Sequence, residues 1–247
     1  MLLSDPSAEH EIRGVFVAGT DTDVGKTVVA SSLAATLDAR GERVAVFKPV
    51  VTGLDELEAT LPDHELLKAS AGSSQRPDRI APYRFGPAVS PHLAAQMVGT
   101  RIDPDLLMRR AREAARNATV LIVEGVGGLM APLTSRYFVR DFASDLGLPL
   151  IVVARPGLGT INHTLLTIEA ARSAGLEVAS VVLTPWPHPP DDVALSNRLT
   201  IAERTCLPVF AIPQLEVGES VPPLVDALAR SLLEPVLPRR RVATLTH

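Results

Sequence analysis

The chain has 247 residues, with 24 basic and 28 acidic side chains and a formal net charge of −4. Its 46% of apolar residues is enough to bury a core, and its mild acidity argues against the basic surface that nucleic-acid binding requires. The single cysteine, Cys206, excludes an internal disulfide and a cysteine-based metal site. The sequence has no long apolar run and begins with an acidic segment, so we expect no membrane contact, no signal peptide and a cytoplasmic location.

Short runs rich in β-branched residues recur along the chain and predict strands. They are apolar throughout instead of alternating with polar residues, which is typical of strands buried on both faces of a parallel sheet. We therefore predict an α/β fold with a mostly parallel sheet. The predicted strands are residues 15–18, 44–47, 120–123, 150–154, 178–183 and 209–212.

Helical patterns separate these runs. Residues 26–40 carry apolar side chains at helical spacing, and Gly41 suits the left-handed position that closes a helix. Residues 103–117 and 162–174 show the same pattern, the second ending at Gly175. Alternation of strand and helix indicates right-handed βαβ units with helices on both faces of the sheet.

Residues 52–104 differ from this pattern because they are rich in proline and hold only a possible short helix at 64–71. We interpret them as an insertion on a single domain that spans 1–247. Residues 1–12 and about 236–247 are expected to be tails. The stretch 185–190 is expected to be a rigid proline-rich loop, too short to link two domains.

The segment Gly-Thr-Asp-Thr-Asp-Val-Gly-Lys-Thr at 19–27 lies between the first predicted strand and the first predicted helix. That context suits a phosphate-binding loop, in which backbone N–H groups surround phosphates, a lysine contacts their oxygens and a hydroxyl binds Mg²⁺. Thr20 stands where the usual pattern has its first glycine, so the loop is a variant. Its predicted nucleotide-binding residues are Thr22, Asp23, Val24, Gly25, Lys26 and Thr27.

Two more charged residues lie at predicted strand ends. Glu124 follows the strand at 120–123, where an acid can hold Mg²⁺ beside a nucleotide, and Gly127 beyond it permits close approach to a phosphate. Lys48 ends the strand at 44–47 and can neutralise charge on a transferred phosphoryl group, with the hydroxyl of Thr52 nearby. We expect polar, exposed surroundings for Lys48, so that Lys48→Ala would lose turnover without unfolding the protein.

Several polar residues have two readings each. Asp63 is either a helix N-cap or a Mg²⁺ ligand supplied by the insertion, and Asp21 is equally ambiguous because an acid repels phosphate unless a cation intervenes. The segment 157–163 is either an anion site rich in N–H groups or an ordinary loop capped by Asn162. His163 as a catalytic base is the weaker reading there.

Four motifs together resemble the dethiobiotin synthetase family, in the family's order and spacing over roughly residues 14–175. The phosphate loop alone is shared with many nucleotide-binding enzymes, whereas its combination with the second and fourth motifs is much more specific. The motifs are Gly-Thr-Asp-Thr-Asp-Val-Gly-Lys-Thr at 19–27, Lys-Pro-Val-Val-Thr-Gly at 48–53, Glu-Gly-Val-Gly-Gly at 124–128 and Gly-Leu-Gly-Thr-Ile-Asn-His at 157–163.

The resemblance implies an ATP-dependent ligase of biotin biosynthesis. Such an enzyme carboxylates 7,8-diaminononanoate with CO₂, phosphorylates the carbamate and closes a ureido ring, giving dethiobiotin, ADP and phosphate. By resemblance, Lys26 and Lys48 are catalytic, and Thr27, Asp63 and Glu124 bind Mg²⁺, with Asp55, Glu56 and Glu58 as competing acids. Family members are homodimers in which the loop at 157–163 contacts substrate bound by the other subunit. The implied substrate-binding residues are Thr22, Thr52, Gly159, Thr160 and Asn162.

The base of the nucleotide is expected to lie beyond the last two strands. Family members often have an asparagine after the strand at 178–183, whereas this chain has Thr-Pro-Trp-Pro at 184–187. Trp186 could stack on a base without contacting its edge, so we hypothesise a relaxed nucleotide preference in which CTP or GTP replaces ATP. Further candidates for base contact are Pro213, Gln214 and Leu215.

Two alternatives share the nucleotide-binding core. A cobyrinate-type amide synthetase would normally carry a glutamine-hydrolysing domain with a nucleophilic cysteine, and Cys206 lies in a poor context for that role. A partitioning-type dimeric ATPase places a signature lysine where this chain has Asp21, and it would need a basic amphipathic segment for membrane binding.

Overall fold

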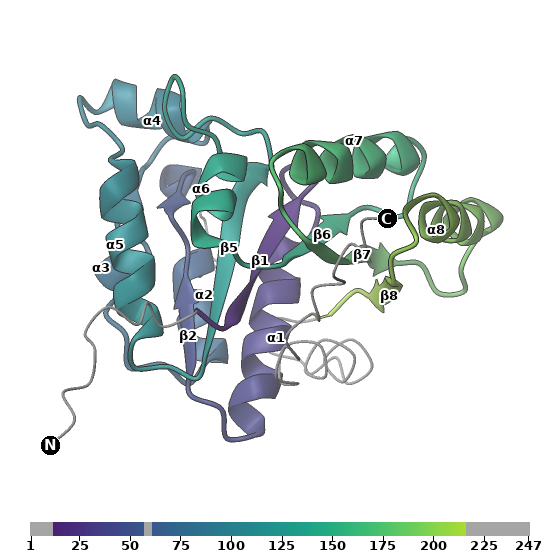
Figure 1. The fold of residues 1–247 in the computed structure, drawn as a ribbon, viewed down its shortest axis with the longest axis horizontal. Helices are drawn as coiled ribbons and strands as arrows, with labels where there is room; N and C mark the ends of the chain where they lie inside the picture. Colours follow the sequence, from purple (N-terminus) through teal and green to yellow (C-terminus); the bar gives the residue numbers. More distant parts are fainter. Residues whose placement is uncertain (1–11, 57–60, 216–247) are drawn as a thin grey trace, which may run out of the picture.

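The fold is described from a computed structural model that covers residues 12–56 and 61–215. A six-stranded sheet with the order β2-β5-β1-β6-β7-β8 forms its centre, and every strand pair in it is parallel (Figure 1). This arrangement confirms the predicted α/β class. The strands are β1 (Gly14–Gly19), β2 (Val44–Phe47), β5 (Val120–Gly128), β6 (Leu150–Ala154), β7 (Val178–Trp186) and β8 (Val209–Pro213).

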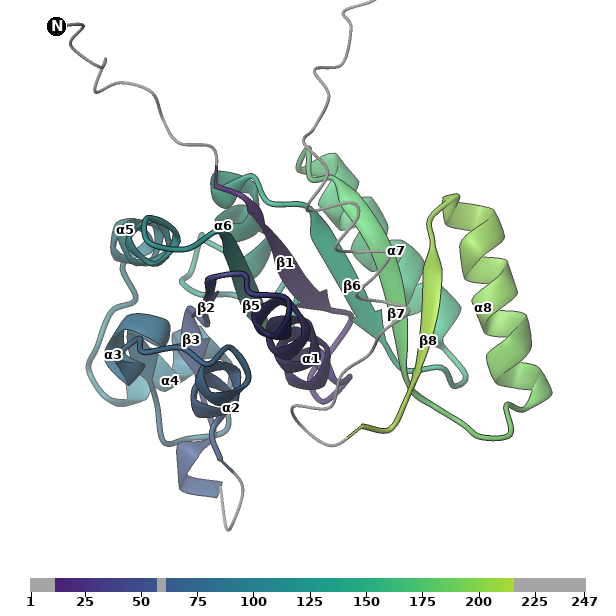
Figure 2. The same cartoon turned by 90° about the horizontal axis from the view of Figure 1, so that it is seen from below.

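Helices cover both faces of the sheet, as Figure 2 shows, with α1 and α2 on one side and α5, α6 and α7 on the other. Two apolar clusters follow from this layering. Alternate residues of one strand serve different clusters: Val15 and Val17 pack with α1, while Phe16 packs with α6 and α7. The helices are α1 (Lys26–Ala39), α2 (Asp63–Ser70), α3 (Pro77–Ile80), α4 (Pro91–Met97), α5 (Pro104–Ala115), α6 (Val139–Leu146), α7 (Thr160–Ser173) and α8 (Asp192–Thr205).

The predicted helix ends agree with the structure where a glycine marks them. Gly41 has a φ of 82° just beyond α1, and Gly175 has a φ of 74° just beyond α7. Both angles lie in the left-handed region that glycine adopts without strain. The predicted strands are also present within a few residues of their expected bounds.

The segment 52–104 adds small elements beside β2 and α5. A two-stranded parallel sheet pairs β3 (Val50–Val51) with β4 (Tyr83–Arg84), and a short 3₁₀ helix, η1, spans Leu54–Glu56. The amide of Gln75 covers the outer edge of β2, since it accepts from Val46 N and donates to Val46 O. The segment therefore covers part of the open edge of the main sheet.

Two local predictions were wrong. The strand at Val120 continues through Gly128, so Glu124 lies inside β5 instead of following it. The strand at Val178 continues to Trp186, because Trp186 still pairs with Pro213, so the proline-rich loop begins later than expected. Proline is tolerated near such a strand end, where few ladder hydrogen bonds remain to be made.

Candidate active site

The loop at 19–27 connects β1 to α1, in the strand–loop–helix context that the sequence predicts. Gly25 has a φ of 92°, and a Cβ added to it would lie 2.7 Å from Thr184 Cγ2 of β7. Only glycine fits this position without strain. The carboxyl ends of β1 and β7 thus lie next to the N-terminus of α1, whose free N–H groups favour an anion.

Lys26 is the first residue of α1 and is buried. Its Nζ donates to the carbonyl oxygen of Asp21, 2.7 Å away, which folds the side chain back over its own loop. Burial, together with the nearby charge of Lys48, lowers the pKa of Lys26 to about 8. The negative charge of a triphosphate bound in the loop would favour the charged form of Lys26 and so raise its pKa.

Four side chains from four different elements meet beside the loop. Thr27 Oγ1 lies 2.8 Å from Glu124 Oε1 and 3.1 Å from Asp63 Oδ1. Lys48 Nζ is 2.5 Å from both Glu124 Oε1 and Asp63 Oδ2. The structure therefore brings together Thr27 of α1, Lys48 after β2, Asp63 of α2 and Glu124 of β5, which we call the site cluster.

The charges in the site cluster depend on one another because most of it is buried. Burial opposes the charge of Lys48, but the carboxylates of Glu124 and Asp63 outweigh it and raise the pKa of Lys48 above its ordinary value. Burial likewise raises the pKa of Glu124, whereas the Lys48 ammonium and the Thr27 hydroxyl bring the pKa of Asp63 below its usual range. Lys48 thus remains a cation at neutral pH.

The site cluster corrects one expectation and removes one of the two readings of Asp63. Lys48 is 3% exposed, not in exposed surroundings, so its replacement will affect folding. Asp63 is the first residue of α2 and Pro62 is the N-cap, so the carboxylate of Asp63 is directed to Thr27 and Lys48 instead of capping the helix. The competing acids Asp55 and Glu56 are exposed in η1, while Glu58 lies outside the described residues.

The oxygen atoms of the site cluster fit a magnesium ion. Glu124 Oε2 is buried without a hydrogen-bond partner, and a hydroxyl with two carboxylates is a set of hard oxygen donors. In the part of the chain that the structure describes, no three His, Cys, Asp or Glu side chains gather into a site of their own. Mg²⁺ usually keeps waters and phosphate oxygens, so it needs few protein ligands.

Other predicted residues surround the loop. Thr22 and Asp23 are exposed, and a Cβ added to Gly127 of β5 would lie 4.0 Å from Thr22 Cγ2. Thr52 is half-buried after β3, and no contact of its hydroxyl with the site cluster is seen among the described residues. Arg155 was missed by the sequence analysis: its Nη2 donates to Thr22 O at 2.9 Å. Its position directly after a predicted strand was the available signal.

The loop at 157–163 does not reach the site cluster within the described part of this chain. The α7 helix begins at Thr160, with Gly159 as its N-cap at a φ of 90°, so the predicted cap at Asn162 was wrong. Thr160 is buried against Thr164, whereas Asn162 is exposed. Asn197 of α8, also missed, holds the loop by donating to Pro156 O and Gly157 O.

The candidates for base contact lie where β7 and β8 end. Trp186 pairs with Pro213, and Arg198 lies over the Trp186 ring at 6.0 Å from its centroid. Val24 of the phosphate loop and Ile212 of β8 belong to the same apolar cluster, and Leu215 packs against this cluster. The end of β8 is therefore continuous with the phosphate loop, while Pro213 and Gln214 remain exposed beside it.

A parallel sheet, a strand–loop–helix phosphate site and a buried cluster of lysine, hydroxyl and acids define a nucleotide-binding protein of the P-loop class. In agreement, residues 13–219 match the family model described as an AAA domain.

Similar proteins identify the family within this class. ATP-dependent dethiobiotin synthetases of Bacillus thuringiensis, Anaeromyxobacter dehalogenans and Bacillus subtilis are 38%, 40% and 37% identical to this chain. The alignments cover 83%, 79% and 81% of this chain and 85%, 89% and 87% of the relatives. The chain belongs to the dethiobiotin synthetase family. This membership favours the synthetase prediction over the amide synthetase and partitioning ATPase alternatives.

Proposed function

We propose that this protein is an ATP-dependent dethiobiotin synthetase that uses 7,8-diaminononanoate and CO₂. The observation that carries the proposal is the site cluster, in which a buried lysine between two carboxylates lies next to the N-terminus of the phosphate-loop helix. No helix in the described part of the chain is long and apolar enough to cross a membrane. We place the reaction in the cytoplasm, where such small metabolites occur.

The proposed chemistry joins two amines through one carbon. One amine of the diamine adds to CO₂ and loses a proton, giving a carbamate. A carbamate oxygen then takes the γ-phosphoryl group of ATP and releases ADP. The second amine attacks the carbonyl carbon of this mixed anhydride, phosphate leaves and the ureido ring closes with loss of a proton.

The two lysines have distinct parts in these steps. The Lys26 side chain lies over the phosphate loop, where its ammonium can bind the outer phosphate oxygens of the nucleotide and stay bound as the phosphoryl group is transferred. Lys48 remains charged beside Glu124 and Asp63, so it can neutralise the carbamate next to the γ-phosphate. Positioning two anions side by side and screening their repulsion is the main task of the protein in a phosphoryl transfer.

Magnesium is part of the proposal. Thr27, Asp63 and Glu124 would hold it, and when bound it screens the charge on the phosphate oxygens of the nucleotide. Asp63 and Glu124 would therefore contact two cations, the Mg²⁺ ion and the Lys48 ammonium.

We further propose that the protein acts as a homodimer. Gly159, Thr160 and Asn162 form the N-terminus of α7, whose helix dipole suits a carboxylate, and no contact of theirs with the site cluster is seen among the described residues. Leu158 in this loop is 99% exposed, which favours its burial against a second copy. Thr22 and Thr52 would line the diamine in the subunit that binds it.

Phosphate release tests the proposed function directly. With ATP and Mg²⁺ present, we expect release only when both diaminononanoate and bicarbonate are supplied, and loss of release when either one is omitted. ATP hydrolysis that is indifferent to the diamine would contradict the synthetase assignment.

Nucleotide preference is a separate prediction. Trp186 is half-buried against an apolar cluster and Arg198 lies over its ring, so a base would stack on the part of the indole that stays exposed. Stacking does not depend on the edge of the base. We expect ATP, CTP and GTP to give values of kcat/KM within about tenfold of one another, and Trp186→Ala to raise KM for all three by a similar factor. Steady-state kinetics with each nucleotide measures both effects.

Trp186→Phe serves as the control, because it keeps an aromatic face and should keep most of the affinity. A strong preference for ATP in the wild type would remove the hypothesis, as would a Trp186→Ala variant with unchanged KM values.

A further inference from the structure

A cleft of about 540 Å³ lies away from the site cluster. Its walls come from the C-terminal end of α1, the start of β2, the segment between α2 and α3, and one side of α5. This volume is within the range of ~300–1,000 Å³ that small-molecule sites occupy. The cleft is therefore large enough for a metabolite.

The position of the cleft separates it from the phosphate loop. Val44, the first residue of β2, lines the cleft, whereas Lys48 of the site cluster follows the other end of that strand. Asp38 near the end of α1 also lines it, a whole helix away from Lys26. The cleft thus lies at the amino ends of the strands, opposite the nucleotide.

Arginines dominate the charge of the cleft. Arg43, Arg76, Arg79 and Arg110 line it together with Asp38, Glu42 and Glu113, a formal charge of +4 − 3 = +1 in a chain whose net charge is −4. Arg76, the N-cap residue of α3, pairs with Asp78 of that helix, and Glu42 accepts from the Thr119 hydroxyl.

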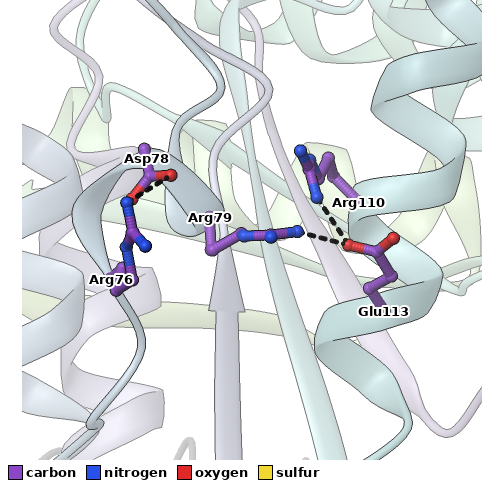
Figure 3. A network of polar contacts seen from close by, with 5 residues as sticks. All are labelled: Arg76, Asp78, Arg79, Arg110 and Glu113. Atoms are coloured by element: carbon purple, nitrogen blue, oxygen red, sulfur yellow. Dashed lines mark hydrogen bonds and ion pairs between the residues drawn. The ribbon is translucent and has the colours of Figure 1, made fainter.

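Two of these arginines meet on one oxygen atom. Arg79 Nη1 of α3 and Arg110 Nη1 of α5 each lie 2.8 Å from Glu113 Oε2, as Figure 3 shows. Guanidinium groups from two separate elements therefore already point at a common anionic oxygen, the geometry in which arginines bind a carboxylate or a phosphate.

The ion pairs that Glu113 makes with the two arginines are weak. Its side chain is 43% exposed and that of Arg79 is 46% exposed, and ion pairs in such surroundings stabilise a protein little. A doubly charged ligand could take the place of the Glu113 oxygen while the carboxylate turns to solvent. No such exchange is open to Glu124 of the site cluster, whose side chain is fully buried.

We propose that this cleft is a second anion site, which binds a phosphate-bearing small molecule through Arg79 and Arg110 in place of Glu113. The site is independent of the proposed synthetase activity, because none of its residues belongs to the phosphate loop or the site cluster. A phosphate group suits it because it supplies several oxygens to guanidinium groups that approach from two directions.

Calorimetric titration with inorganic phosphate tests the proposal. The full chain is first saturated with Mg²⁺ and a non-hydrolysable ATP analogue, so that the phosphate loop is filled. We expect saturable phosphate binding that Arg79→Gln and Arg110→Gln each weaken by about tenfold, the loss typical of a hydrogen bond between charged groups. Glu113→Gln should strengthen binding, because it removes the competing carboxylate.

Arg109→Gln is the matched control, since Arg109 precedes Arg110 on α5 but does not line the cleft. It should leave phosphate binding unchanged, and thermal unfolding of every variant confirms that the fold is retained. Three results would overturn the proposal: no saturable binding by the wild type, binding by both arginine variants as tight as that of the wild type, or weaker binding by Glu113→Gln than by the wild type. The last would mean that the three residues serve only to join α3 to α5.

Discussion

Lys48→Met is expected to lose turnover at least about 100-fold and to lower the free energy of unfolding by about 3–5 kcal/mol. Methionine keeps the length of the buried stem but removes the ammonium that lies 2.5 Å from both Glu124 and Asp63. Glu124 is fully buried and would then be an uncompensated charge. Chemical denaturation measures the stability, and phosphate release measures the turnover.

A second substitution separates the two effects. Lys48→Met combined with Glu124→Gln removes the buried charge pair as a unit, so stability should recover most of the loss while turnover stays low. The control is Lys68→Met, the same change at the one lysine of the chain outside the phosphate loop and the site cluster, half-buried on α2. A Lys48→Met variant that unfolds like the wild type would contradict the burial described above. If it kept its turnover, Lys48 would have no part in the chemistry.

The fold could be predicted largely because its strands are buried on both faces. Continuous apolar runs such as 150–154 mark central strands of a parallel sheet, and the glycines at 41 and 175 mark helix ends. The short helix α6 and the helix α8 were not predicted. The α8 helix has a mostly exposed surface with a weak apolar stripe, so its stability depends on contact with α7 and β8, which a local pattern does not reveal.

The sequence predicted which residues form the site better than it predicted how deeply they are buried. Lys48 and Glu124 each follow or end an apolar run, which placed them at the correct edge of the sheet. Their mutual burial could not be predicted, because it requires Asp63, from the proline-rich segment 52–104, to meet residues far away in the sequence. Arg155 and Asn197 both donate to backbone carbonyls, for which the sequence carries no motif, and only the position of Arg155 after a predicted strand was a signal.

Glu124→Gln should give the opposite stability result to Lys48→Met. The change keeps the shape of a fully buried side chain, and Lys48 retains Asp63 as an anionic partner. Burial already raises the pKa of the Glu124 carboxyl, which shows that the protein holds this charge against a desolvation cost. We therefore expect the free energy of unfolding to change by less than about 1 kcal/mol.

Turnover of the same variant should fall at least about 100-fold, and the Mg²⁺ concentration that gives half-maximal rate should rise about tenfold or more, because an amide is a poorer ligand for a hard cation than a carboxylate. Magnesium titrations of phosphate release measure this, with Glu177→Gln, an exposed acid before β7, as the control. An unchanged magnesium dependence would remove Glu124 from the metal site. A large loss of stability would instead mean that the Glu124 carboxylate is needed to hold the Lys48 ammonium in the fold, and that Asp63 alone cannot compensate this buried charge.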